Sequence, residues 1–276
     1  MKNWKRLPQD SFVAKYIECY WLLEKEHDDI ASLHPKLNPN ANTHLILAND
    51  AEKYHFSQGA ILQTGYGSHW IFPHKKTFVM DHSQPFLILG IKFKVGALYS
   101  ASYLAHDFSL DSVIKVCIDD LMTSDSFKLP ELLAQAVESP EQTCKILDKL
   151  LLPLLLDSQE DKHSELILRA LPLVADTSIS NIGKLLHCSQ RTIERAFLRV
   201  TKLTLKQYKS MIRLEKVLSY LYHRQGGSIN WAQIANQFEF SDQPHLIRYL
   251  KSTIGTTPGN YLQQRDLTID VYGDFE

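Results

Sequence analysis

An internal repeat in the C-terminal part of this chain most constrains the fold that the sequence can adopt. When the sequence is compared with itself at an offset of 53 positions, identical residues coincide at Gln190 and Gln243, Arg195 and Arg248, Thr204 and Thr257, and Tyr208 and Tyr261. Self-similarity at a fixed offset is typical of a structural unit that occurs more than once. Two copies are too few for a solenoid, so the repeat predicts a duplicated module over about residues 178–262.

Each copy is expected to contain two short helices joined by a turn. The apolar face of the first helix in the first copy is formed by Ile182, Leu185 and Leu186. A break follows at His187, and Ser189 is a favourable N-cap for a second helix that runs to about Val200. In the second copy the turn falls at residues 238–240, and Asp242 caps the second helix. Between the copies, the apolar spacing predicts one longer amphipathic helix from Leu205 to about His223.

The second helix of each copy has a polar face that suits DNA. Its residues are Gln190, Arg191, Glu194, Arg195 and Arg199 in the first copy, and Gln243, His245, Arg248 and Lys251 in the second. A single helix with Arg and Gln outside is usually only a solvated surface helix. The duplication favours a binding surface, because both copies place Gln and Arg at the same exposed positions. These side chains read adenine and guanine edges in the major groove.

Charge is divided unevenly along the chain. Residues 177–265 contain 13 Lys and Arg against 4 Asp and Glu, whereas the whole chain has a net charge of −1. The rest of the chain is therefore acidic. A basic domain on an acidic body is typical of nucleic-acid-binding proteins.

The C-terminal motifs resemble the AraC/XylS family of bacterial transcription regulators. The residues that carry the resemblance are 213–215 (Arg-Leu-Glu), Ile234 and Ala235, 240–248 (Phe-Ser-Asp-Gln-Pro-His-Leu-Ile-Arg) and 255–261 (Gly-Thr-Thr-Pro-Gly-Asn-Tyr). The resemblance covers about 85 residues. It implies a seven-helix domain in which a long helix joins two helix-turn-helix units, each placing a recognition helix in the major groove.

The resemblance also implies roles for individual residues. The expected base-contacting residues are Gln190, Arg191, Glu194, Arg195, Gln243, His245 and Arg248, and the expected phosphate-contacting residues are Ser189, Arg199, Lys202, Lys206 and Lys251. We assign the largest share of base reading to Arg195 and Arg248. Phosphate contacts are expected to set register and affinity rather than sequence preference.

The chain departs from the family pattern at several turn positions. The glycine usual in each helix-turn-helix turn is replaced by His187 and Glu239, and a further glycine, after the first recognition helix, is replaced by Lys202. Histidine tolerates a positive φ better than glutamate does. Pro244 lies in the first turn of the second recognition helix, where proline is tolerated. We expect these changes to affect the preferred DNA sequence more than the fold.

Short β-type runs separated by turn residues precede this domain. They are Thr43–Leu47, 54–56, 61–62, 77–80 and Phe86–Phe93. This spacing favours an antiparallel barrel or sandwich. An N-terminal cupin-like sensing barrel is common in the family, and residues 90–97 and 107–110 resemble the N-terminal domain of one AraC-type subgroup. We therefore expect a two-domain α+β protein, with an N-terminal antiparallel cupin-like β barrel plus helices and a C-terminal all-α domain.

Neither the histidines nor the cysteines predict a metal site or a cofactor. Six histidines, His34, His44, His55, His69, His74 and His82, lie close together in the sequence, but no His-x-His pair occurs among them. Core or solvated histidines are the favoured interpretation, with metal binding as the alternative. Cys19, Cys117, Cys144 and Cys188 have no paired spacing, so we expect buried, unreactive thiols rather than a redox sensor.

Helical patterns follow Phe93. Ser139 and Pro140 predict a capped helix start. The stripe along that helix is formed by Cys144, Ile146, Leu147, Leu150, Leu151 and Leu154. The stripe fits either a helix packed on its own barrel or a dimerisation helix. We expect a sensing and dimerisation domain over 1–157, a linker over 158–166, a DNA-binding domain over 167–265 and a tail over 266–276.

The N-terminal segment has no apolar run of signal-peptide length, and the longest apolar run, 150–156, is too short to span a bilayer. We expect a cytoplasmic transcription regulator that binds double-stranded DNA and is controlled by its N-terminal domain, and not an enzyme. A small-molecule effector, a homodimer and activation through RNA polymerase follow from the resemblance alone. The alternatives are a DNA-binding antagonist or scaffold without small-molecule sensing, and a metal cupin or alkyl-transfer enzyme fused to a DNA-binding domain.

Overall fold

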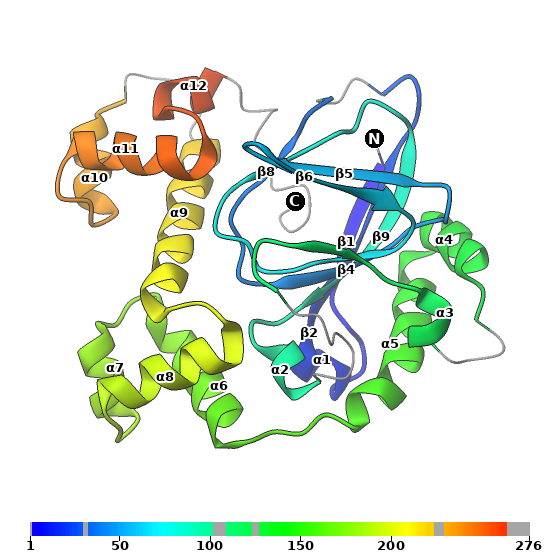
Figure 1. Cartoon of the computed structure of the whole chain (residues 1–276), viewed down its shortest axis with the longest axis horizontal. Coiled ribbons are helices and arrows are strands. Elements are labelled where there is room, and N and C mark those ends of the chain that lie inside the picture. The colour runs from blue at the N-terminus through cyan, green and yellow to red at the C-terminus, as the bar shows by residue number, and fades with distance from the viewer. Residues whose placement is uncertain (1, 30–32, 102–108, 123–126, 224–228, 264–276) are drawn as a thin grey trace.

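The computed structural model describes residues 2–29, 33–101, 109–122, 127–223 and 229–263. It contains an N-terminal domain of strands and flanking helices and a C-terminal domain of helices only (Figure 1). The predicted two-domain α+β architecture is confirmed. The expected tail, 266–276, lies outside the described residues.

Two antiparallel sheets form the N-terminal domain. The first has the order β1 (Lys2–Arg6), β2 (Ile17–Lys25), β9 (Phe86–Phe93), β4 (Thr43–Leu47), β7 (His69–Ile71) and β10 (Val113–Lys115). The second has the order β3 (Lys36–Leu37), β8 (Phe78–Met80), β5 (Lys53–Gln58) and β6 (Ile61–Tyr66). The runs predicted at Thr43–Leu47 and Phe86–Phe93 match β4 and β9 residue for residue.

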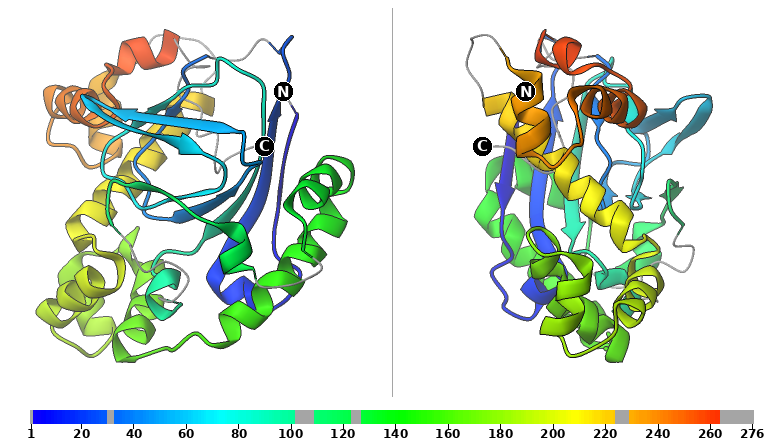
Figure 2. Two further views of the ribbon diagram at one scale, coloured as in Figure 1. Left: turned by 45° about the vertical axis from the view of Figure 1, so that its right-hand side comes forward. Right: turned by 90° about the vertical axis from the view of Figure 1, so that its left-hand side faces the viewer.

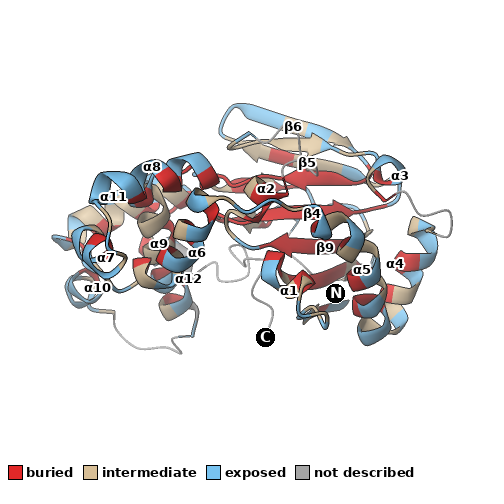
Figure 3. Ribbon diagram, turned by 90° about the horizontal axis from the view of Figure 1, so that it is seen from below, coloured by how far each residue is buried: buried red, intermediate tan, exposed pale blue. Residues whose placement is uncertain are grey.

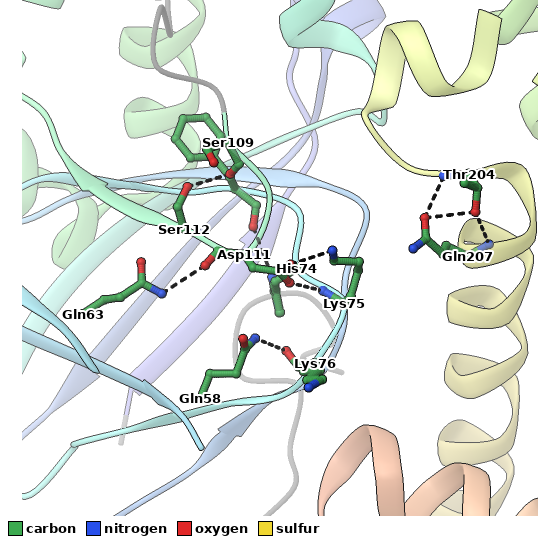
Figure 4. A network of polar contacts seen from close by, with 11 residues as sticks. Gln58, Gln63, His74, Lys75, Lys76, Ser109, Asp111, Ser112, Thr204 and Gln207 are labelled. Carbon is green, nitrogen blue, oxygen red and sulfur yellow. Dashed lines mark hydrogen bonds and ion pairs between the residues drawn. The ribbon is translucent and has the colours of Figure 1, made fainter. Parts of the chain in front are cut away.

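The two sheets do not close into the expected barrel. Within the described ranges no strand pair joins them, and a side chain bridges one open side instead. Gln63 of β6 donates to the carbonyl of Asp111 at 3.1 Å (Figure 4). Its side-chain oxygen also accepts from the amide of Val113 at 2.6 Å. The structure therefore corrects the closed barrel to two facing sheets joined at this edge by one glutamine.

Side chains fill the space between the sheets. Trp21, Phe56 and Phe78 are at most 2% exposed and belong to one apolar cluster drawn from both sheets. Gly90 of β9 is required beside this cluster, because a Cβ there would lie 1.9 Å from the Trp21 ring. Alternate residues of β2, such as Tyr20 and Leu22, enter a second cluster on the other face of the first sheet.

Helices cover that other face: α1 (Val13–Tyr16), α2 (Ala97–Ser100), α3 (Ile118–Leu121), α4 (Leu129–Glu138) and α5 (Pro140–Leu156). A buried carboxylate anchors α5 to the sheet, since Asp148 accepts from Tyr20 Oη at 2.7 Å and from the amide of Gln9 at 2.7 Å. Pro140 begins α5 as predicted. The predicted capping box is wrong, because the Ser139 side chain makes no cap hydrogen bond.

The predicted stripe on α5 is divided between two surroundings. Cys144, Leu147 and Leu151 are buried against the domain's own core. Ile146, Leu150 and Leu154 are half-buried and line a groove with α4. The helix thus packs on its own domain, and a role in dimerisation stays a prediction.

Four of the six clustered histidines, His44, His69, His74 and His82, are buried. Within the described ranges, no group of three or more His, Cys, Asp or Glu side chains is arranged to hold a metal ion. Cys19 and Cys144 are buried as expected, whereas Cys117 is exposed. No helix in the described part of the chain is long and apolar enough to cross a membrane.

The C-terminal domain contains α6 (Lys162–Val174), α7 (Ile179–Leu185), α8 (Gln190–Thr201), α9 (Leu205–His223), α10 (Trp231–Gln237), α11 (Gln243–Ile254) and α12 (Pro258–Gln263). Helix α6 begins after Asp161, within the expected linker of residues 158–166. The Asp161 side chain accepts from the amides of His163 and Ser164, and Ser164 Oγ accepts from the amide of Asp161, which completes a capping box. Two views show α9 running between two groups of helices beside the sheets (Figures 1 and 2).

We expect stability to fall on acidification because of two buried histidines. Burial lowers the pKa of His69 and of His82 to about 4 from the ordinary 6.5. Below pH 6.5 the unfolded chain takes up protons that the folded chain resists, so each histidine should remove up to about 3 kcal/mol of unfolding free energy by pH 4. Urea unfolding at several pH values measures this loss.

The variants His69→Gln and His82→Gln provide the internal control. Each should flatten the pH dependence by about one histidine's share, about 3 kcal/mol between pH 6.5 and 4. An unfolding free energy with the same pH slope in wild type and both variants would contradict this explanation.

Candidate nucleic-acid interface

The first helix-turn-helix unit consists of α7 and α8. Ser178 caps α7 and Ser189 caps α8, where its Oγ accepts from the amide of Thr192 at 3.1 Å. Residues Ile193, Ala196, Phe197 and Val200 of α8 are buried as predicted. The predicted inward position of Leu185 is wrong. Its side chain is 57% exposed because α7 ends there and the chain turns away.

The second unit consists of α10 and α11. Asn230 caps α10, and Asp242 caps α11 by accepting from the amide of His245 at 2.6 Å. Pro244 lies in the first turn of α11, where its missing N–H leaves no intrahelical bond unmade. The predicted cap and the predicted proline position are both confirmed.

Helix α9 joins the units and spans the predicted residues. At its start, Thr204 and Gln207 bond each other's amides through their side chains, at 2.8 and 3.2 Å (Figure 4). Farther along, the Tyr249 hydroxyl donates to the carbonyl of Ser210 at 2.8 Å. Arg213 donates to the carbonyl of Glu239 at 3.2 Å and lies over the ring of Phe240. These contacts attach the second unit to α9.

The two units share a backbone pattern that the sequence shows only in part. All three residues at usual glycine positions, His187, Glu239 and Lys202, have φ between 55° and 60°. Gly255, the counterpart of Lys202, has φ 70°. The chain therefore adopts left-handed turns here without glycine at three of four places.

The offset between the units changes within the turn. Helices α7 and α10 begin 52 residues apart, whereas α8 and α11 begin 53 residues apart. The second turn thus has one more residue between its left-handed position, Glu239, and its N-cap, Asp242. The sequence comparison missed this insertion because its identical pairs all follow the turn.

The ribbons of α8 and α11 both carry exposed stretches (Figure 3), and the predicted base-contacting residues on these helices are exposed or half-buried. Gln190, Arg191, Glu194, Arg195 and Arg248 are exposed, while Gln243 and His245 are half-buried. Three of these side chains make local contacts. Gln190 Nε2 donates to Glu194 Oε1 at 2.8 Å, and His245 Nδ1 lies 3.1 Å from Ser241 Oγ.

The predicted phosphate-contacting residues Ser189, Arg199, Lys202, Lys206 and Lys251 are all exposed. One of them already has a partner in the N-terminal domain. Arg199 Nε donates to the Tyr99 hydroxyl at 2.8 Å, and that hydroxyl donates to Asp161 Oδ2 at 2.7 Å. Sequence reasoning missed Tyr99, since no pattern links it to a residue 100 positions away.

Two family models match separate parts of the chain. A helix-turn-helix domain model matches residues 182–264, and a domain of unknown function (DUF6597) matches residues 5–109. A curated relative, the HTH-type transcriptional regulator YidL of Escherichia coli K12, is 32% identical over 89 residues. That match covers 32% of this chain and 29% of the relative, so the chain spans less than a third of that protein's length.

Solved structures with similar chain paths were also found. Apo ToxT from Vibrio cholerae, in a variant form, aligns over 95% of this chain and 100% of its own, with 14% identity and a TM-score of 0.46. The DNA-binding domain of AdpA in complex with a target DNA aligns over 38% of this chain and 92% of its own, with 17% identity and a TM-score of 0.30.

The left-handed position at Glu239 should limit stability. A side chain in the left-handed conformation costs about 1–2 kcal/mol, and glycine has an entropic cost of about 0.5–1 kcal/mol. The variant Glu239→Gly should therefore raise the free energy of unfolding by about 0.5–1 kcal/mol. The matched control is Gly255→Ala, where the added Cβ meets no atom within 4 Å and only the backbone is strained. That variant should lose about 1 kcal/mol. Chemical denaturation of both variants measures these changes in the free energy of unfolding. A change of the same sign in both variants would contradict backbone strain at Glu239.

Proposed function

We propose that this chain is a transcription regulator whose AraC-type helix-turn-helix domain, residues 182–264, reads two adjacent major-groove segments with α8 and α11. One observation carries the proposal. Both units present a capped helix with an exposed, Arg-bearing face, and the two faces repeat at one offset. Recognition helices contact base edges with their N-terminal residues, about one DNA turn, roughly 34 Å, apart.

The proposed division of roles follows side-chain chemistry. Gln190, Arg191, Glu194 and Arg195 of α8 contact bases in the first segment, and Gln243, His245 and Arg248 of α11 contact bases in the second. Arginine binds guanine through two parallel hydrogen bonds, which supports the leading roles of Arg195 and Arg248. Both arginines are exposed, so DNA can reach them without a rearrangement of the fold.

The remaining cations bind the DNA backbone in this proposal. Lys202 and Lys251 are near the C-terminal ends of α8 and α11, and Lys206 lies in the first turn of α9. Each phosphate contact releases counterions, so affinity falls as salt rises. The excess of Lys and Arg in residues 177–265 supports this contribution.

The proposed domains keep the boundaries 1–157, 158–166, 167–265 and 266–276. Since α6 starts at Lys162, the extended part of the linker is confined to the residues before it. Control by the N-terminal domain is part of the proposal. Buried aromatic side chains occupy the space between the two sheets. This supports control that needs no ligand bound between the sheets, as in the alternative of a DNA-binding antagonist or scaffold.

A crevice between the domains supports a different site of control. It has a volume of about 320 Å³, and its lining includes Lys15, Lys94 and Val95 of the N-terminal domain and Ile167, Leu168 and Val200 of α6 and α8. A small molecule that entered there would touch the recognition helix α8 directly. A regulator rather than an enzyme is the class that the helix-turn-helix match and the curated relative support.

Binding-site selection with the purified full chain tests the proposed function. The expected result is a motif of two elements about one helical turn, roughly 34 Å, apart. Arg195→Ala should degrade one element and Arg248→Ala the other. Failure to enrich any motif, from the full chain and from residues 162–276 alone, would contradict the proposal.

Arg248 and Lys251 provide a matched pair for the division of roles. Arg248→Ala should weaken binding to the selected site by about 1–3 kcal/mol and relax base preference at one position. Lys251→Ala should weaken binding to specific and to random DNA by the same factor. It should also reduce the slope of log affinity against log salt concentration by about 1, as expected for one lost phosphate contact. Titrations on both DNAs at several salt concentrations measure this. Equal losses on specific and random DNA for both variants would show that the assigned roles are wrong.

A further inference from the structure

Two separate contacts join the N-terminal domain to the C-terminal ends of the two recognition helices. One is at the end of α8, around Tyr99 and Arg199, and the other is at the end of α11, around Thr77 and Thr253. The N-terminal halves of both helices, which are the parts expected to enter DNA grooves, carry exposed arginines instead. The N-terminal domain therefore holds both helices without covering the residues expected to read bases.

The contact with α8 includes a continuous apolar core. Ala41, Val95 and Tyr99 of the N-terminal domain belong to the same cluster as Phe197 and Val200 of α8. The backbone of Gly96 also lies close to α8, because a Cβ there would meet Val200 Cγ1 at 2.8 Å. The first unit and the N-terminal domain are thus packed as one body.

The contact with α11 is of a different kind. Thr77 donates to the carbonyl of Thr253 from its amide at 3.3 Å and from Oγ1 at 3.0 Å, and Lys36 Nζ donates to the carbonyl of Ile254 at 3.5 Å. The last carbonyls of a helix have no partners within the helix, and a cation is favourable at that end. Three donors of the N-terminal domain therefore complete the end of α11, and partial burial that lowers the pKa of Lys36 fits this close approach.

The second unit has its own core. The buried members of that core all lie between residues 214 and 254, and they come from α9, α10, α11 and the turn before α11. The first core, in contrast, extends from the N-terminal domain to Met211 of α9. Helix α9 therefore links two separate cores. Both units pack on α9, but a single helix of 19 residues can bend and twist, so contacts outside α9 help to fix how one unit is turned relative to the other.

We propose that Thr77 and Lys36 are positioning residues for DNA recognition, which hold α11 in the orientation, relative to α8, in which both helices bind DNA at once. This inference rests on the proposed function. The two helix-turn-helix units are then connected twice, once through α9 and once through the N-terminal domain. Loss of the Thr77 and Lys36 contacts should free the second unit to rotate, so that DNA elements at other separations become acceptable.

The test compares the full-length wild type with the double variant Thr77→Val/Lys36→Met. The DNAs are the selected two-element site, the same site with one base pair inserted or deleted between the elements, and a site with the first element only. The matched control is Thr64→Val/Lys53→Met, which makes the same chemical changes at exposed positions on β5 and β6.

We expect the control to behave as the wild type, with a marked loss of affinity on the altered spacings. The Thr77/Lys36 variant should bind the natural spacing about five- to tenfold more weakly, as expected for lost hydrogen bonds, and should discriminate little among spacings. Its affinity for the first element alone should equal that of the wild type, because α8 is held by a different contact.

Three outcomes would overturn the inference. They are an unchanged spacing profile in the variant, tighter binding by the variant, and an equal loss on the one-element site, which would indicate a general folding defect. Absence of wild-type binding to any two-element site would instead contradict the proposed function, before the variants are compared.

Discussion

The arrangement of this protein depends on one apolar cluster shared by its two domains. Phe197 and Ile193, from the first recognition helix, are fully buried in it, and Val95 and Tyr99 of the N-terminal domain pack against it. Burial of apolar surface is the main source of folding free energy. A cluster that includes both domains therefore couples the position of α8, the first of the two proposed recognition helices, to the folding of the sheets, so the two domains are not simply tethered modules.

Local sequence rules located the helices of the repeat in the C-terminal domain and the long helix between its two copies. Helix periodicity located α9 over Leu205–His223, and Ser189 and Asp242 marked the starts of α8 and α11. Both signals are readable from sequence because N-caps and apolar stripes are properties of short segments. The exposed polar faces of α8 and α11 followed from the same periodicity, whereas the DNA-contact roles of their residues came from the family resemblance. Leu185 was misplaced because the helix ends within the turn that would have buried it.

The N-terminal domain was less predictable for two physical reasons. Strand β2 is buried along most of its length, so Ile17–Lys25 shows no alternation between apolar and polar residues. Its edge partner β1 is short and mostly polar, with Trp4 as its one buried side chain. Contacts between the domains, such as Arg199 with Tyr99, depend on the final packing and leave no periodic trace in the sequence.

The extra residue in the second turn has an evolutionary consequence. The insertion lies in an exposed turn, at or next to Ser241, and the helices on either side keep their caps and their buried faces. A duplicated unit that accepts a change of length at this place can alter how its proposed recognition helix would meet DNA while its core stays intact. The two helix-turn-helix units can therefore diverge separately. In the proposed function, one unit could acquire a new target sequence while the other keeps the old one.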